Sequence, residues 1–463
     1  MIIAGDRLAF LARYGTALFC MSAICFGFPH VAYSQALRFQ PQGARAVGQG
    51  NAFTAQADDA SAIHYNPAGL TQVDGVQAIV GTLLMGGSIK YKSPTGADVR
   101  GDFGGSVVSP LPSHTYVSAD LGALGMPSLS RVTVGLGLTS PFGLNTRYPV
   151  DGPFNTAATS ATLPLFDIKP TVAYKVTDNL SIGFGADIYT FASFLGEGQV
   201  EQHQVGSGSL GIPPGASIEL NGKGTGVGMN ASLMYQPIKN REGKPLASIG
   251  LVYRSQAVLP LQGALLVNGT KAADAATSLA LPPIYTAAAA VWPVRTSERE
   301  WKLELDVDYV AWKSNKQLDV HLSNGVTVPQ PQQWTSVQVV AVGTEYKWLT
   351  PSWLPNWDVA VRAGYTRTED PVPDLTFNPA TISLASNTLS LGAGLLCGKG
   401  GRFLGMVPCG GESALLPKAI GFDVAYQEWF YETRTVAGNL NPAVNGTYHA
   451  FVHLGTFSLK LFF

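Results

Sequence analysis

The stretch Trp301-Lys-Leu-Glu-Leu-Asp-Val-Asp-Tyr309 alternates strictly between apolar and charged residues. Successive side chains of a β-strand point to opposite faces, so this segment has one apolar face and one charged face. Trp357-Asp-Val-Ala-Val-Arg-Ala-Gly-Tyr365 and Ile168-Lys-Pro-Thr-Val-Ala-Tyr-Lys-Val176 have the same period of two. Such strands are typical of a membrane β-barrel, in which the apolar face meets lipid and the polar face meets the lumen.

The composition of the 463-residue chain favours a membrane barrel over a soluble enzyme or a helix bundle. Hydrophobic residues make up 46% of the chain and charged residues 13%, and that charged share is about half of what soluble globular proteins carry. Apart from one N-terminal stretch, the apolar residues are interleaved with Gly, Ser, Thr and charges instead of forming the runs of about 20 that transmembrane helices need. The formal net charge of -1 argues against a nucleic-acid-binding protein.

Fourteen segments with this alternation follow residue 75, and turns separate them. We expect strands near residues 76–89, 114–121, 131–140, 166–176, 179–194, 225–236, 247–257, 283–294, 301–312, 334–348, 357–366, 387–396, 419–429 and 447–463. An even number of antiparallel strands, with long extracellular and short periplasmic connections, is typical of bacterial outer-membrane barrels. The connections alternate in this way, except that the even-numbered connection 397–418 is long. The sequence therefore predicts an all-β fold, a 14-stranded antiparallel transmembrane β-barrel over residues 76–463.

The first 34 residues are predicted to be a cleaved signal peptide. Two arginines precede an apolar run over residues 14–28, and the small residues Ala32 and Ser34 follow. This order is typical of a secretory signal. We expect cleavage after Ser34, with cleavage after Ala36 or a single membrane anchor as the alternatives.

Two of the four cysteines, Cys397 and Cys409, lie outside the signal peptide. In an exported protein, two cysteines so close in sequence are expected to form a disulfide, which would shorten the long connection that holds them. Their spacing does not fit a CxxC metal site, and no histidine cluster lies nearby. We expect no metal and no cofactor; a redox role is the alternative to a structural disulfide.

The final strand carries a possible assembly signal. Phe457, Leu459, Leu461 and Phe463 share one face of this strand. A terminal strand that ends in Phe resembles the signal that the barrel assembly machinery of the outer membrane recognises. This feature predicts the outer membrane of a Gram-negative bacterium as the location.

Residues 35–75 do not alternate and are dominated by small and polar residues. A 14-stranded barrel has a lumen too wide for strand side chains alone to fill. We therefore expect this segment, called the hatch below, to fold into the barrel from the periplasmic side and plug the lumen.

Several stretches resemble the FadL/TodX family of outer-membrane transporters of long-chain fatty acids and aromatic hydrocarbons. The stretch Gly43-Ala-Arg-Ala-Val-Gly-Gln-Gly-Asn-Ala-Phe53, together with Asn66-Pro-Ala68, resembles the hatch of that family. Further similar stretches are 170–176 with 180–185, and 363–365 with 371–374 and 389–394. The resemblance extends, in order, over nearly the whole mature chain.

The resemblance implies passive uptake of hydrophobic small molecules. The ligand would be captured at extracellular loops and would diffuse laterally through a wall opening next to the hatch, at a kink in the third strand. The implied hatch residues are Asn66, Pro67, Ala68, Asp58 and Asp59. The implied opening comprises Gly135, Gly137, Pro141, Phe142 and Gly143, because proline cannot donate a ladder hydrogen bond and glycine weakens a strand. Alternatively, Pro141 simply ends the strand at the outer rim.

The ligand class stays open between fatty acid and hydrocarbon. A buried carboxylate needs a cationic partner, and the stretch Asp187-Ile-Tyr-Thr-Phe-Ala-Ser-Phe194 contains none. Phe191 and Phe194 would suit a hydrocarbon. Arg147 is our candidate partner for a carboxylate, with Arg362 and Arg367 as alternatives.

Two other classes of membrane protein are alternatives to a transporter of hydrophobic molecules. A general diffusion porin would have a water-filled, charge-lined channel and no hatch. An outer-membrane lipase would need a positioned serine, histidine and acid, but the chain has no G-x-S-x-G and its histidines are scattered. We therefore expect no enzyme activity. The expected partners are a hydrophobic ligand, outer-membrane lipid and lipopolysaccharide, and the barrel assembly machinery; no nucleic acid is expected. We expect the protein to be a monomer.

Overall fold

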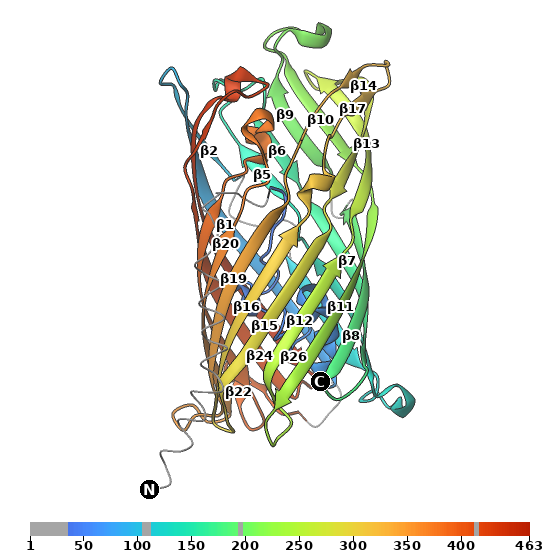
Figure 1. Ribbon diagram of the computed structural model, residues 1–463, viewed down its shortest axis with the longest axis vertical. Helices are drawn as coiled ribbons and strands as arrows, with labels where there is room; N and C mark the ends of the chain where they lie inside the picture. The colour runs from blue at the N-terminus through green and yellow to red at the C-terminus, as the bar shows by residue number, and fades with distance from the viewer. Residues whose placement is uncertain (1–35, 104–112, 193–197, 412–415) are drawn as a thin grey trace. The chain divides into compact units, whose positions relative to one another are not determined.

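The computed structural model describes residues 36–103, 113–192, 198–411 and 416–463. The predicted signal peptide and Phe194 lie outside these ranges. Within them, long antiparallel strands close into a barrel (Figure 1). In wall order they are β1 (Val76–Lys92), β3 (His114–Asp120), β4 (Val132–Thr139), β7 (Leu165–Lys175), β8 (Leu180–Phe191), β11 (Gly226–Lys239), β12 (Pro245–Arg254), β15 (Ile284–Arg295), β16 (Arg299–Val310), β19 (Val337–Trp348), β20 (Trp357–Thr368), β21 (Ser386–Cys397), β24 (Ala419–Tyr431) and β26 (Gly446–Phe462).

The wall closes where β26 pairs with β1, from Gln77 opposite Phe462 to Lys92 opposite Thr447. Every neighbouring pair in this order is antiparallel. The prediction of a 14-stranded antiparallel barrel is confirmed. Each observed strand falls within a few residues of its expected bounds.

The strand β16 shows why the alternation predicted the fold. Its charged side chains face the lumen, where Lys302 and Glu304 are buried, whereas Trp301 and Tyr309 are exposed on the outside. A side chain on the outer face meets lipid, and a side chain on the inner face meets the contents of the barrel. No helix among the described residues is both long enough and apolar enough to span a bilayer.

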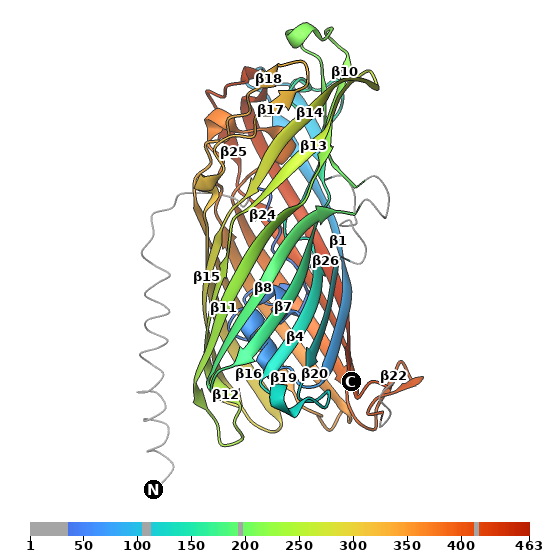
Figure 2. The same ribbon diagram turned by 90° about the vertical axis from the view of Figure 1, so that its right-hand side faces the viewer.

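Shorter strands continue the wall beyond the long ones, at the end of the barrel opposite the C-terminus (Figures 1 and 2). They are β2 (Asp98–Asp102), β5 (Leu144–Arg147), β6 (Ser160–Leu163), β9 (Val200–Val205), β10 (Ser217–Lys223), β13 (Ala257–Val267), β14 (Thr270–Leu281), β17 (Val320–Leu322), β18 (Thr327–Val328) and β25 (Arg434–Val436). These stretches were expected to be loops. The hairpin β13–β14 turns at Asn268-Gly269, both with positive φ, and Asn-Gly is the dipeptide that favours a tight hairpin.

The remaining elements are short. The hatch contains the helices α2 (Ala44–Val47) and α3 (Ala62–Tyr65) and the 3₁₀ turn η1 (Pro67–Gln72). Further 3₁₀ turns are η2 (Pro127–Leu129), η4 (Ser209–Gly211), η5 (Trp312–Ser314), η6 (Asp374–Thr376), η7 (Pro379–Thr381) and η8 (Pro442–Val444). The long connection after β21 forms the small hairpin β22 (Arg402–Phe403) and β23 (Val407–Pro408). A disulfide joins Cys397 to Cys409 there, with their Cα atoms 5.9 Å apart.

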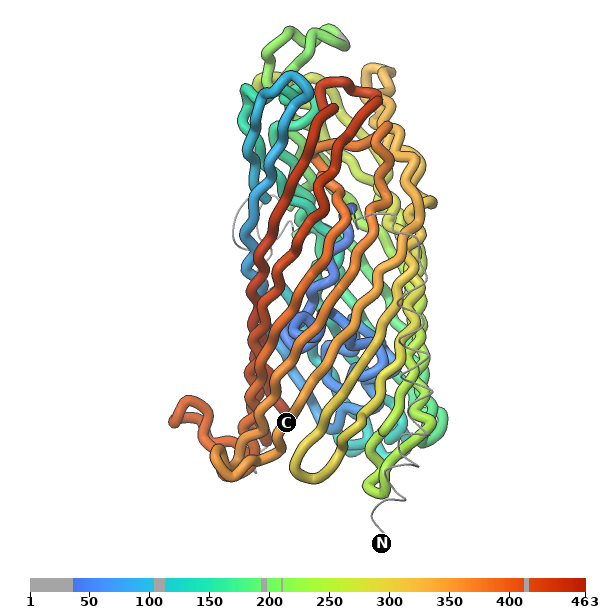
Figure 3. The backbone as a smooth tube through the Cα atoms, turned by 60° about the vertical axis from the view of Figure 1, so that its left-hand side comes forward, coloured from blue at the N-terminus to red at the C-terminus, as the bar shows by residue number. Residues whose placement is uncertain are grey.

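The described part of the hatch lies inside the barrel, in the half that holds the C-terminus (Figures 2 and 3). Ala44, Val47, Phe53 and Ile63 are fully buried. The lumen of this half is therefore filled by the hatch together with the inward-facing side chains of the strands.

Candidate functional site

The Asn66-Pro67-Ala68 motif forms a tight turn against the barrel wall. The Asn66 Nδ2 atom donates to the Thr54 carbonyl at 2.8 Å, and its Oδ1 atom accepts from the Ala68 amide at 3.2 Å. Asn66 thus caps the turn η1, and Pro67 occupies the first position, where no backbone donor is needed. A Cβ atom on Gly183 of β8 would lie 2.4 Å from the Ala68 nitrogen, so only glycine lets the motif approach this closely.

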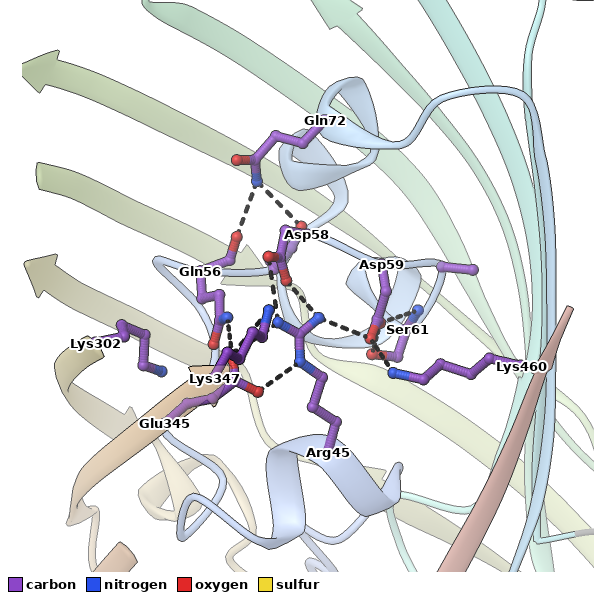
Figure 4. Close-up of polar contacts among 12 residues, drawn as sticks. Arg45, Gln56, Asp58, Asp59, Ser61, Gln72, Lys302, Glu345, Lys347 and Lys460 are labelled. Atoms are coloured by element: carbon purple, nitrogen blue, oxygen red, sulfur yellow. Dashed lines mark hydrogen bonds and ion pairs between the residues drawn. The ribbon is translucent and has the colours of Figure 1, made fainter. Parts of the chain in front are cut away.

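A buried network of charges joins the hatch to the wall (Figure 4). Arg45 of α2 contacts Asp58 at 2.7 Å, Asp59 at 3.3 Å and Glu345 of β19 at 3.0 Å. The network continues through Arg362–Glu345 at 2.6 Å, Arg362–Asp423 at 2.7 Å, Lys460–Asp423 at 2.5 Å, Lys460–Asp59 at 3.6 Å and Lys347–Glu345 at 3.1 Å. Each charge has an opposite partner, as buried ions require. Asp58 and Asp59, which the resemblance to the family pointed out, therefore belong to this network.

The acidic residues of β16 hold the backbone of the hatch. One Asp306 oxygen accepts from the amides of Phe53 and Thr54 at 3.1 and 3.0 Å. One Glu304 oxygen accepts from the amides of Ala55 and Gln56 at 2.6 and 3.2 Å. The alternation predicted that these carboxylates lie on the polar face of the strand, but it did not predict which groups they bind.

Asp308, next along the same face, contacts the Arg38 guanidinium at 2.7 Å. Sequence reasoning missed Arg38, because it precedes the first strand and matches no motif.

The third barrel strand, β4, ends in the middle of the wall. Gly135 and Gly137 face the hatch, where added Cβ atoms would lie 2.6 and 2.8 Å from atoms of Ile63. These glycines therefore allow close contact with the hatch.

Beyond Thr139 the chain turns inward and pairs with the first described residues. The Phe39 amide donates to the Pro141 carbonyl at 2.8 Å, and the Gly143 amide donates to the Leu37 carbonyl at 2.9 Å. Arg38 and Phe142 form the bridge between these two hydrogen bonds. The wall continues above this point with β5, so Pro141 lies inside the barrel, away from the outer rim.

Among the described residues, the ladder on one side of β1 has a gap beside this inward turn. β3 pairs with β1 only up to Gly81, and β2 pairs with it only from Ser88. Among the described residues, no strand pairs with residues 82–87 on that side, whereas β26 covers them on the other. Residues 104–112, which connect β2 to β3 on this side of β1, lie outside the described residues.

A cavity of about 170 Å³ lies above the hatch. Of the residues predicted to form the opening or bind the ligand, Phe142 and Gly143 line this cavity. Phe191 is buried in the same apolar cluster as Phe142 but does not line the cavity. Arg147 is exposed on β5. The lining residues are Ala36, Arg38, Phe39, Gln40, Asn51, Met85, Phe103, Ser140, Phe142, Gly143, Leu144, Asn145, Thr162, Leu163, Pro164, Leu165, Thr366, Thr368, Thr381, Ile382, Ser386, Thr388, Gln427, Trp429, Tyr431 and Val452. Within the described part of the chain, Arg38 is the single charged residue of this lining.

The other predicted cations have partners already. Arg362 belongs to the hatch network, and Arg367 contacts Glu432 at 2.5 Å. Among the described residues, no three histidines, cysteines, aspartates or glutamates form a metal site.

A cluster of loops lies at the end of the barrel opposite the C-terminus. Arg434 contacts Asp370 at 2.5 Å and Asp374 at 2.6 Å, and its guanidinium lies 4.8 Å from the centre of the Phe377 ring. Burial raises the pKa of the Asp370 carboxyl to about 6, although Arg434 opposes that shift. Arg434 thus ties the loop after β20 to the loop after β24.

Comparisons with known proteins point to one family of transport proteins. The model of the outer membrane protein transport protein family (OMPP1/FadL/TodX) matches residues 30–395. The long-chain fatty acid transport protein of Escherichia coli (strain K12) is 24% identical over 379 residues, which cover 72% of this chain and 79% of that protein.

Two solved structures have the same fold. A FadL homologue from Pseudomonas aeruginosa has a TM-score of 0.68 at 16% identity, covering 92% of this chain and 99% of that one. The toluene transporter TodX of P. putida has a TM-score of 0.58 at 16% identity, also covering 92% and 99%.

Proposed function

The chain belongs to the outer membrane protein transport protein family (OMPP1/FadL/TodX), and on that premise we propose that it imports hydrophobic small molecules by lateral diffusion through its wall. The family consists of transport channels of the Gram-negative outer membrane, not of enzymes. The ligand is captured at the loop end of the barrel, enters the cavity above the hatch and leaves sideways at the end of β4.

The observation that carries this proposal is the position of the cavity. It lies where β4 leaves the wall, and Phe142 and Gly143 of the inward turn line it together with Met85 of β1. Met85 belongs to residues 82–87 of β1, for which no described strand is the partner on one side. A ligand in the cavity is thus adjacent to both the inward turn after β4 and this stretch of β1.

The physical advantage of this route is that the ligand stays in apolar surroundings. An oily molecule loses hydrophobic stabilisation if it passes through a water-filled pore. The hatch closes such a pore in the opposite half of the barrel, where its buried residues fill the lumen. Transport needs no energy source if a downstream reaction removes the ligand.

The cavity volume bears on the size of the ligand. A cavity of about 170 Å³ is close to the roughly 150 Å³ that accommodates benzene in an engineered protein core. It is smaller than the roughly 300–1,000 Å³ of typical small-molecule sites. A single aromatic ring fits entirely, and a long acyl chain fits only at one end. Both ligand classes named for the relatives are therefore compatible with it.

Uptake of labelled oleate and labelled toluene by a transporter-deficient bacterial strain tests this function. The variant Gly143→Phe fills the cavity, because a Cβ atom at this position meets only the Leu163 carbonyl oxygen, at 3.5 Å. We expect the uptake of both ligands to fall to the level of the empty strain. Pro141→Val, which restores a backbone donor at the inward turn, should also reduce uptake.

Leu391→Phe is the matched control, because this side chain is 65% exposed on the outer face of β21, away from the inward turn. This variant should transport normally. Normal uptake by folded Gly143→Phe would exclude the cavity as the route. Steady ion conductance of the native protein in planar bilayers would support a general diffusion porin instead.

A further inference from the structure

We propose that the cavity above the hatch binds neutral hydrophobic molecules that carry an oxygen, such as phenols, and prefers them to hydrocarbons of the same shape. This inference rests on the proposed function, because it names the ligand class of the same cavity. The observation that carries it is a row of hydroxyl groups in the cavity lining. The row crosses the neighbouring strands β20, β21 and β24.

The pairing of these strands sets the row. Thr368 of β20 lies directly opposite Ser386 of β21, and Ser386 lies directly opposite Tyr431 of β24. Directly opposite residues of antiparallel strands have Cβ atoms about 4.5–5.5 Å apart. All three residues line the cavity, and so does Thr388, which is two positions beyond Ser386 on the same face of β21. The four side chains are called the hydroxyl row below.

The hydroxyl row is free to bind a ligand. Among the described residues, none of its four oxygens has a hydrogen-bond partner. Thr368, Ser386 and Thr388 are buried within the barrel. The oxygens of the row are not enclosed by protein atoms, in contrast to the Ser140 oxygen of the same lining, so a molecule in the cavity can reach them. A hydroxyl both donates and accepts a hydrogen bond, so the row offers the ligand neutral groups of both kinds.

The neighbouring polar side chains of the lining hold the hatch instead. The Thr366 hydroxyl of β20 donates to the Gly50 carbonyl at 2.5 Å. Gln427 of β24 donates to the Val47 carbonyl at 3.1 Å and accepts from the Trp429 indole, also at 3.1 Å. These groups contribute to the position of the hatch, whereas no such contact occupies the hydroxyl row.

The rest of the lining suits an uncharged aromatic ring. Phe142 and Leu165 line the cavity, and its volume of about 170 Å³ is enough for one ring. Arg38, the single charged residue of the described lining, is paired with Asp308 at 2.7 Å, and its Nη1 atom is enclosed by protein. An anionic ligand would have to compete with Asp308 for this cation, and a charge buried without a partner is costly. The lining therefore favours a neutral oxygen.

The hydroxyl row also explains how two molecules of the same shape would be distinguished. A hydrocarbon that fills the cavity displaces water from the row and returns no hydrogen bond. Polar groups left without a partner in this way weaken binding. A ligand hydroxyl or carbonyl oxygen replaces the lost hydrogen bonds, so the oxygenated molecule binds more tightly.

The test is equilibrium binding of labelled p-cresol and labelled p-xylene to the purified protein. The two probes differ in one hydroxyl, which replaces a methyl group of similar size. The triple variant Thr368→Val, Ser386→Ala, Tyr431→Phe removes three hydroxyls with little change of volume. We expect it to weaken p-cresol binding by about tenfold, the usual effect of losing a hydrogen bond, and not to weaken p-xylene binding. Each probe is compared with its own binding to the native protein, so the different solubilities of the probes cancel.

Tyr365→Phe is the matched control, because it removes a hydroxyl from the exposed outer face of β20, outside the cavity. This variant should bind both probes as the native protein does. The single variant Thr368→Val should weaken p-cresol binding by a smaller factor, which covers the case that the triple variant does not fold. Barrel folding is checked for every variant by its heat-dependent mobility in SDS gels.

Three results would overturn the inference. Equal weakening of both probes by the triple variant would mean that the row only shapes the cavity. Unchanged p-cresol binding would place the partner of the oxygen elsewhere. Tighter binding of labelled p-toluate than of p-cresol to the native protein would make carboxylates the preferred class. In each case, toluene uptake that Gly143→Phe blocks would leave the proposed function standing, whereas toluene uptake that Gly143→Phe does not affect would contradict the proposed function itself.

Discussion

The carboxylate of Glu345 accepts two hydrogen bonds from the guanidinium of Arg45, both of 3.0 Å. This bidentate pair joins the barrel wall to the hatch, and Arg362 approaches the same carboxylate at 2.6 Å. The hatch is thus held by buried charges as well as by packing. A buried ion pair is worth little compared with an apolar replacement, but removing one partner leaves an uncompensated charge.

We therefore expect Glu345→Ala to weaken hatch docking by about 3–5 kcal/mol, the usual effect of breaking a buried pair. The barrel itself should still form, because the strand ladders do not depend on this side chain. The measurement is ion conductance in planar bilayers, which should increase as the hatch loosens. Glu298→Ala, at an exposed turn, is the control and should not conduct. A closed Glu345→Ala variant would show that packing alone holds the hatch.

The contact between Gly183 and the Asn66-Pro67-Ala68 turn gives a second prediction. A side chain on Gly183 would lie 2.4 Å from the Ala68 nitrogen, so Gly183→Val should displace the turn. We expect reduced toluene uptake from a folded barrel. Gly455→Val is the matched control, since nothing lies within 4 Å of a Cβ atom there. Full uptake by Gly183→Val would mean that the seating of this turn is not needed for transport.

Removal of the Cys397–Cys409 disulfide should affect stability more than function. The two cysteines are 12 residues apart, and closing a loop of about that length stabilises a protein by roughly 3 kcal/mol in the chain-entropy model. We expect the Cys397→Ser, Cys409→Ser double variant to unfold at a lower temperature and to transport normally. The disulfide lies at one end of the β21–β24 pair, whereas the cavity residues Ser386 and Tyr431 lie at the other end. A strong loss of uptake would assign this connection a direct role.

The stability of the loop cluster around Arg434 should depend on pH. The pKa of Asp370 is about 6 in the folded loop and about 3.9 in an unfolded chain, so the folded loop binds more protons between these values. Its stabilisation is therefore complete below about pH 4 and is lost as the pH rises through about 6. We expect protease cleavage of this loop to accelerate over that range. Asp370→Asn should remove the pH dependence, and an unchanged profile would attribute it to another group.

The barrel could be predicted from the sequence because its signal is local. Each long strand meets lipid on one face and the lumen on the other, so the alternation is visible within any ten residues, as in the segment from Trp301 to Tyr309. The strands β13 and β14 lie in a stretch predicted to be a loop, although the Asn268-Gly269 turn between them is a typical hairpin signal.

The site was less predictable because its contacts join distant parts of the chain. Glu304 was placed on the lumen face, but the Ala55 amide that it binds is 249 residues away in sequence. Arg38 and Asp308 are 270 residues apart. Arg147, the predicted partner of a carboxylate, is exposed in the structure. Phe194 lies outside the described residues.

The hydrogen bond from the Ala44 amide to the Ser458 hydroxyl, at 3.1 Å, joins residues 414 positions apart. The hatch is made from the first described part of the chain, yet part of its binding surface belongs to β26, the strand that also closes the wall against β1. The barrel cannot close before this strand is in place, and the hatch lacks its contacts to Ser458 and Lys460 until then. Contacts of such sequence separation are slow to form, so the newly exported chain must survive for some time with its lipid-facing surfaces uncovered. Closing the wall with β26 therefore also completes part of the surface on which the hatch is seated.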